Sequence, residues 1–140
     1  MFNTLRKSYR YREYAPIDSF TVSELREFCK ILNQYCSDMI GYRKTKGLPT
    51  YSVRKDNTLT YYGQYYPTEH KIYVYYNNVG NLKMFVRTFI HEYTHSIQNL
   101  SYYANRLNKF GYKEHPDEVQ AREMELHHYR SALKYLKSKI

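Results

Sequence analysis

Long apolar runs, tryptophan and cysteine are scarce or absent in this sequence of 140 residues. No stretch reaches the roughly 18 apolar residues of a membrane-spanning helix, and the first residues, MFNTLRKSYRYREY, lack the apolar centre of a signal peptide. The two cysteines, Cys29 and Cys36, lie about two turns apart in a helical pattern, which is too far for a disulfide bond. We therefore expect two buried free thiols, no membrane span and a cytoplasmic or other intracellular location.

Internal repeats, low-complexity tracts and linkers are also absent, so residues 1–140 are predicted to form one domain. A hydrophobic content of 42% argues against disorder. The sequence contains nineteen tyrosines. Because a tyrosine ring can be buried while its hydroxyl stays in water, we interpret most of them as strand faces and the rim of the core.

Acidic residues are outnumbered by basic ones, which gives a formal net charge of +9. Part of this charge lies in residues 1–17, which we predict to be a basic, tyrosine-rich arm or short strand. Excess positive charge favours acidic or nucleic-acid partners. Since no nucleic-acid-binding motif accompanies it, we interpret the charge as an influence on the choice of partner rather than as the function.

The order of predicted elements indicates an α+β fold. A capping box at Thr21–Glu24 begins a helix over residues 21–39, Asn81 is a plausible N-cap for a helix over 82–100, and Pro116 suits the first position of a helix to about 138. Between the first two helices, tyrosine and β-branched residues predict a small sheet of three antiparallel strands. The strands are expected at residues 51–54, 59–66 and 71–76. Residues 101–115 are expected to connect the second and third helices.

The segment His91-Glu92-Tyr93-Thr94-His95 lies in the second predicted long helix. Residues four apart share one side of a helix, so His91 and His95 can direct two imidazoles at one metal ion. The apolar stripe of this helix falls on the opposite side, so the two histidines are not expected to fill the core. Glu92 flanks the pair, where it can act as the general base of a zinc hydrolase.

A third metal ligand has to come from another part of the chain. One family pattern places a glycine and a histidine three and six residues after the second histidine, but this sequence has Gln98 and Ser101 there. We favour Glu118, in the first turn of the last helix, because the small Ala121 would let that helix approach the histidine helix closely. His115 is the second choice, and it could equally cap the helix or support a ligand.

Other polar residues of the last helix receive different predictions. Asp117 is interpreted as a helix-end charge or as a residue that orients a ligand histidine. Glu123 and Glu125 are interpreted as residues of a solvated face. His127 and His128 are expected to be surface or packing residues.

The segments HEYTHSIQ and YKEHPDEVQARE resemble the gluzincin clan of zinc metallopeptidases, especially its minimal single-domain, minigluzincin-like forms. The resemblance covers about residues 58–125. It implies a zincin-like fold with one zinc ion held by His91, His95 and Glu118, and Glu92 as general base. It also implies a peptide substrate bound as an extra strand at a sheet edge, for which residues 71–76 are our candidate. The first fifty residues carry no family signal, and a thermolysin-like second domain is lacking.

A transition-state oxyanion would need a hydrogen-bond donor, and Tyr112, Tyr103 and Tyr102 are candidates, with Tyr112 the preferred one. Two other functions are consistent with the sequence: a non-catalytic binding or structural protein, such as a phage or mobile-element component, and a DNA-associated protease. Self-inhibition by the basic arm or by a tail is a further hypothesis. The intact Glu92 argues against a purely structural zinc site, since such a site needs no base.

Overall fold

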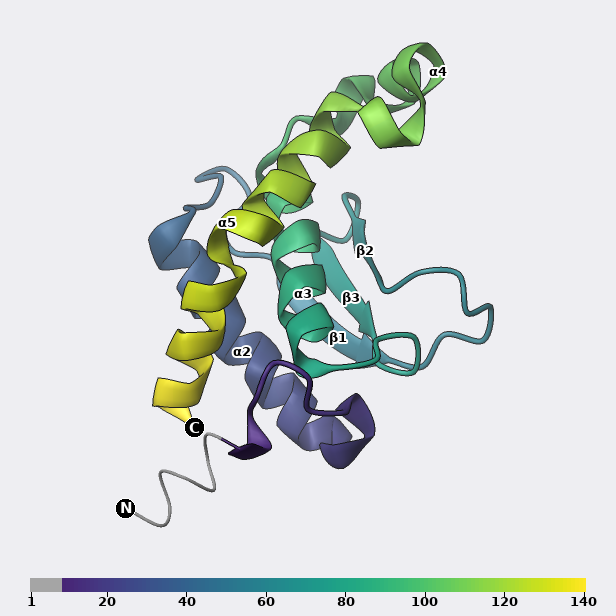
Figure 1. Ribbon diagram of the computed structural model, residues 1–140. Helices are drawn as coiled ribbons and strands as arrows, with labels where there is room; N and C mark the ends of the chain where they lie inside the picture. The colour runs from purple at the N-terminus through teal and green to yellow at the C-terminus, as the bar shows by residue number, and fades with distance from the viewer. Residues whose placement is uncertain (1–8) are drawn as a thin grey trace.

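The computed structural model describes residues 9–140. In that part of the chain, four α-helices and a small three-stranded sheet confirm the α+β class. The helices and strands, labelled as in Figure 1, are η1 (Ile17–Ser19), α2 (Val22–Met39), β1 (Thr50–Arg54), β2 (Gly63–Tyr66), β3 (Lys71–Tyr75), α3 (Leu82–Ile97), η2 (Leu100–Tyr102), α4 (Tyr103–Glu114) and α5 (Pro116–Lys139).

Helix α2 begins and packs as its sequence predicts. The Thr21 hydroxyl accepts a hydrogen bond from the Glu24 backbone N–H, and the Glu24 carboxylate accepts one from the Thr21 N–H, which is the predicted capping box. Cys29 and Cys36 are buried and unpaired, as expected. Burial raises the pKa of both thiols, because a thiolate loses its hydration in the core.

The sheet differs from the prediction. Its strand order is β1-β3-β2, with β1 parallel and β2 antiparallel to β3, so the prediction of three antiparallel strands is wrong. Strand β3 is central rather than at an edge, because it pairs with β1 on one side and with β2 on the other. Its residues Ile72, Tyr73 and Val74 are all buried. Strands β1 and β2, which the prediction would pair as antiparallel neighbours, are not paired with each other. Instead Asp56 is held by Asn77 and Asn78, so the chain passes across to the far side of β3.

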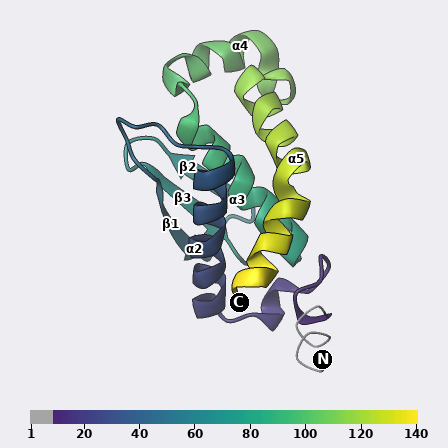
Figure 2. The ribbon, with the colours of Figure 1, turned by 90° about the vertical axis from the view of Figure 1, so that its left-hand side faces the viewer.

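Three layers build the molecule (Figure 2). The sheet forms the first layer, α2 and α3 lie together on one of its faces, and α5 packs against the other side of α3. The core between the layers is rich in aromatic and aliphatic side chains that are completely or almost completely buried, including Phe28, Phe85, Phe89, Tyr93 and Leu136. Helix α3 is therefore held between sheet and α5, which leaves few of its residues exposed.

The predicted arm, residues 1–17, is described from residue 9 onward. Its described part packs against the start of α3, where the Leu82 and Lys83 N–H groups donate to the Ala15 and Glu13 carbonyls. Tyr11 stacks on the Phe20 ring within the core. Residues 1–8 lie outside the described residues, so the hypothesis of self-inhibition by the arm stays open for them.

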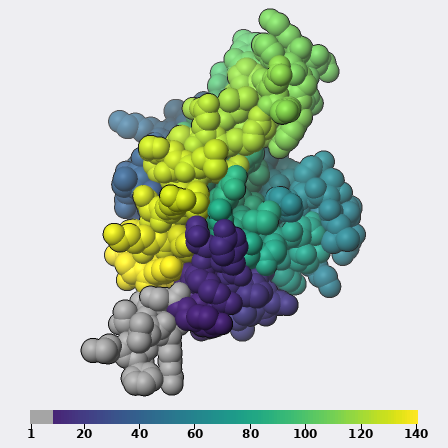
Figure 3. All heavy atoms as spheres, in the orientation of Figure 1, coloured from purple at the N-terminus to yellow at the C-terminus, as the bar shows by residue number. Residues whose placement is uncertain are grey.

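The stretch predicted as a connection, residues 101–115, is helical up to Glu114. The predicted helix over 82–100 ends at Ile97, and η2 and α4 follow, with a break at Gly111, whose φ of 72° is one that favours glycine. The space-filling view shows that α4 and the start of α5 protrude from the rest of the molecule (Figure 3). Within residues 9–140, none of the helices combines the length and the apolar character that crossing a membrane requires.

Candidate metal centre

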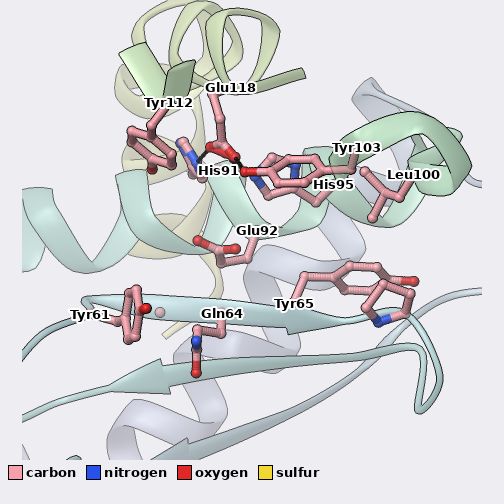
Figure 4. Close-up of a pocket in the computed structure, with 12 residues that line it drawn as sticks. Tyr61, Gln64, Tyr65, His91, Glu92, His95, Leu100, Tyr103, Tyr112 and Glu118 are labelled. Carbon is pink, nitrogen blue, oxygen red and sulfur yellow. Dashed lines mark hydrogen bonds and ion pairs between the residues drawn. The ribbon is translucent and has the colours of Figure 1, made fainter. Parts of the chain in front are cut away.

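Three side chains from two helices meet at one point (Figure 4). His91 and His95 lie one turn apart on α3, and Glu118 lies in the first turn of α5. Glu118 Oε1 is 2.9 Å from His91 Nε2 and 3.1 Å from His95 Nε2. The ligand atoms of the three residues all lie within 4.8 Å of one another, so this group is close enough to bind a metal ion.

The start of α5 explains why Glu118 reaches the histidines. His115 is the N-cap: its Nδ1 accepts a hydrogen bond from the Asp117 N–H, and its Nε2 lies 3.0 Å from the Tyr103 carbonyl. His115 is therefore a cap rather than a ligand in this structure. Ala121 is fully buried, which permits the close approach of α5 to α3. Asp117 pairs with Arg106 and orients neither ligand histidine through its carboxylate.

On one side of the cluster, His91 is held by a charged support, by which we mean Glu125 and Arg87. Glu125 Oε2 lies 2.5 Å from His91 Nδ1, and Glu125 Oε1 accepts a hydrogen bond of 3.1 Å from Arg87 Nε. The prediction of Glu125 as a solvated residue is thus wrong, since its side chain is only 12% exposed. Glu123, by contrast, is exposed as predicted. The signal for Glu125 was its seven-residue separation from Glu118, which is two helical turns on the same face.

On the other side, His95 is held by an amide support, by which we mean Gln98 and Gln120. Gln98 Oε1 lies 2.6 Å from His95 Nδ1. The amide nitrogen of Gln98 donates to the Asp117 carbonyl and to Gln120 Oε1. Sequence reasoning missed this arrangement, because it depends on where α5 lies relative to the end of α3.

The hydrogen bonds from the two supports show whether the histidines are oriented for metal binding. An acceptor at each Nδ1 favours the neutral tautomer with its proton on Nδ1, which leaves the Nε2 lone pairs of His91 and His95 directed at the shared point. Together with a carboxylate oxygen of Glu118, this is a two-nitrogen, one-oxygen donor set. The residues therefore fit a divalent cation in both chemistry and orientation.

Protons and a metal ion would compete for the same nitrogen and oxygen atoms of His91, His95 and Glu118. Burial lowers the pKa of His91, but hydrogen bonds to Glu118 and Glu125 outweigh it and raise the pKa to about 10. Burial raises the pKa of Glu118, but hydrogen bonds from His91, His95 and Tyr103 outweigh it and hold that pKa well below its usual range. A cation that binds here would displace protons from the imidazoles.

Glu92 lies beside the cluster without being part of it. Its side chain is nearly buried, and its carboxylate lies between the cluster and strand β2 (Figure 4). Burial raises the pKa of Glu92, an effect that His91 and His95 reduce. Glu92 thus flanks His91 and His95, which is the location that the sequence predicts.

The three candidate tyrosines have different surroundings. The Tyr103 hydroxyl donates a 2.7 Å hydrogen bond to Glu118 Oε2, so Tyr103 supports a ligand. Tyr112 lines the groove and is more than half exposed, and burial of its hydroxyl region together with the charge of Glu118 raises its pKa to about 12. Tyr102 is exposed and is not among the residues that line the groove.

His127 and His128 lie on α5 away from the cluster. His128 is buried against Tyr35 and His127 is exposed, as predicted.

A groove runs past the cluster as two adjoining cavities of about 350 Å³ and 360 Å³. Strand β2 forms one wall through Gly63, Gln64 and Tyr65, whereas the predicted edge, residues 71–76, lies behind it. A Cβ on Gly63 would lie 2.7 Å from both the Tyr73 carbonyl oxygen and Thr88 Cγ2. The lack of a side chain at Gly63 therefore allows β2 to approach α3 closely.

Comparisons of this chain with models of known protein families, with curated proteins and with solved structures find no match.

Proposed function

We propose that this protein is a zinc-dependent hydrolase whose substrates are peptides. The observation that carries the proposal is the convergence of two imidazoles and one carboxylate, with a second, nearly buried carboxylate in the same groove. The first three groups suit a metal ligand set, and the fourth suits a base. A site that served structure alone would have no use for that fourth group.

Zinc suits this donor set, because catalytic zinc sites combine three nitrogen or oxygen ligands from the protein with one open position. His91 and His95 would bind it through Nε2, and Glu118 through a carboxylate oxygen. When bound, zinc supplies Lewis-acid chemistry that lowers the pKa of water and stabilises negative charge on oxygen. The charged and amide supports hold the two imidazoles in the orientation that binding requires.

Glu92 acts as the general base in this proposal. Its carboxylate takes a proton from the attacking water and then delivers it to the nitrogen of the leaving amine. Because burial raises its pKa, the carboxylate is a better proton acceptor than an exposed glutamate. The Tyr112 hydroxyl, with a pKa of about 12, keeps its proton at neutral pH and donates a hydrogen bond to the oxyanion.

The groove supports peptides as the substrate class. Among residues 9–140, strand β2 pairs with β3 on one side only, so its other edge carries backbone groups that an extended peptide can pair with. Residues Gly63–Tyr65 of that strand line the groove beside Glu92. A peptide added to this edge would bring a backbone carbonyl close to the metal ligands.

Metal analysis and hydrolysis of a mixture of quenched fluorescent peptides test the proposal. The wild type is expected to hold about one zinc ion per chain and to cleave peptides. Glu92→Gln should keep its zinc and lose roughly 100-fold or more in rate, because the amide cannot accept the proton. Glu123→Gln removes the same charge at an exposed position and serves as the control.

Two results would contradict the proposal. A wild-type protein that purifies without zinc and does not take up added zinc would show that the cluster is not a zinc site. Equal hydrolysis by the wild type and by Glu92→Gln would show that Glu92 is not the general base.

A further inference from the structure

The groove is chemically different on its two sides. Besides His95 and Glu118 of the cluster, the cavity on the His95 side is bordered by Gln64, Tyr65, Pro67, Leu100 and Tyr103, which carry no charge at neutral pH. The cavity on the His91 side, which we call the arginine cavity, is bordered instead by Thr60, Tyr62, Arg87, Thr88, Arg122 and Glu125. Both cavities share Tyr61, Gly63, His91, Glu92 and Tyr112, so a chain bound across the metal ligands would place residues in each.

Arg122 supplies positive charge to the arginine cavity. Its Nη2 donates a hydrogen bond to the Lys113 backbone carbonyl, which fixes the guanidinium without neutralising it. Among residues 9–140, no ion pair includes Arg122. A guanidinium carries several N–H donors in one plane, so donors remain for a ligand after this one bond.

Arg87 and Glu125, two other charged residues of this cavity, form an ion pair with each other. Glu125 uses one carboxylate oxygen for Arg87 and the other for His91. Arg87 uses only its Nε in that pair, and its side chain is 34% exposed. Glu92 is the other carboxylate of this cavity, and it lies beside His91 and His95, whose charges interact with it. Of the two arginines that border the cavity, Arg122 is therefore the one without a carboxylate partner among residues 9–140.

We propose that the arginine cavity is a specificity site that binds a carboxylate of the substrate, with Arg122 as the residue that recognises it. This inference rests on the proposed peptide hydrolysis, because it assigns one side of the same groove. In a peptide the carboxylate comes either from an aspartate or glutamate side chain or from the chain terminus. A carboxylate matches the planar, two-pronged donors of a guanidinium, and such charge-assisted bonds are the stronger class of hydrogen bond.

Peptide pairs that differ only in this charge test the proposal. One set carries Glu, Gln or Lys in turn at each position, and a second set ends in a free acid or an amide. Affinity is measured by fluorescence anisotropy on the full-length Glu92→Gln protein with added zinc, and kcat/KM is measured on the wild type. We expect about a tenfold preference for the carboxylate peptide, as one charge-assisted hydrogen bond provides.

Arg122→Gln should lower that preference to about twofold or less, whereas Arg130→Gln should leave it unchanged. Arg130 is an exposed residue of the same helix that lies outside the groove, so it controls for the change in overall charge. A preference for internal Glu in amidated peptides assigns the site to a side chain, and a requirement for the free acid assigns it to the terminus.

The outcomes separate this inference from the proposed function. Tighter binding of carboxylate peptides without any hydrolysis would contradict the proposed hydrolase function but support the carboxylate site. Hydrolysis with equal affinity for all peptides would contradict the carboxylate site but support the hydrolase function. A full preference in Arg122→Gln would overturn the role of Arg122.

Discussion

The two histidines of the candidate metal centre share one helix and one acceptor, yet their supports differ. His91 relies on the charged support of Glu125 and Arg87, and His95 on the amide support of Gln98 and Gln120. The His95 and Gln98 pair is the more buried one, whereas the Arg87 side chain is one-third exposed. Burying a charge is costly, so the neutral support lies in the interior and the charged support lies where solvent reaches.

Loss of Glu118 should have the largest effect, because this residue serves both sides of the cluster. Glu118→Ala removes the carboxylate that both Nε2 atoms approach. We expect zinc affinity to fall by more than about 100-fold, which exceeds the loss typical of supporting residues. Competition with a chromophoric chelator measures it, and a drop smaller than tenfold would exclude Glu118 as a ligand.

Loss of the charged support should have the next largest effect. Glu125→Ala leaves His91 Nδ1 without its acceptor and Arg87 without its partner. Zinc affinity should fall by roughly 30-fold, within the range for residues that orient a ligand. Glu125→Gln should fall in between, because its amide oxygen still accepts from Nδ1 but carries no charge. Equal affinity in all three proteins would show that Glu125 does not orient His91.

Loss of the amide support should cost less zinc affinity and more stability. Gln98→Ala removes a neutral acceptor from His95 and also the bonds that join the end of α3 to Asp117 and Gln120. We expect about a tenfold loss of zinc affinity. The free energy of unfolding without metal should fall by about 1–2 kcal/mol, since buried partners are left unpaired. Urea denaturation in the presence of chelator checks this, and an unchanged midpoint would contradict it.

The smallest change tests the tyrosine next to the cluster. Tyr103→Phe removes one hydrogen bond to Glu118 and keeps the ring in place. Zinc affinity should fall by a few fold, as loss of one charge-assisted bond near a ligand predicts. The same chelator competition measures it, with Tyr102→Phe as the exposed control. A loss in Tyr103→Phe no larger than in the control would mean that this bond does not support Glu118.

The parts of the site that are local in sequence could be predicted, and those that depend on packing could not. The spacing of His91 and His95, the capping box of α2 and the proline start of α5 are each contained within a few residues. The spacing of Glu118 and Glu125 places both on one face of α5, but the contact of Glu125 with His91 depends on how α5 packs against α3. That packing is not contained in any local pattern, so Glu125 was predicted to be a solvated residue.

The strand order of the sheet also depends on contacts between residues far apart in the sequence, so it could not be predicted from local patterns. The sequence predicted three antiparallel strands, but Asp56, after β1, is held by Asn77 and Asn78 from beyond β3. That contact joins residues about twenty positions apart and sends β2 to the opposite edge of the sheet. As a result β2, and not the predicted 71–76, borders the groove.

Anomalous diffraction at the zinc edge, on crystals of the full-length protein grown with zinc, tests the proposed metal centre directly. We predict one strong peak bonded to Nε2 of His91, Nε2 of His95 and a carboxylate oxygen of Glu118, at roughly 2.0–2.2 Å from each. A peak bound by other residues, or no peak in the cluster at saturating zinc, would contradict it.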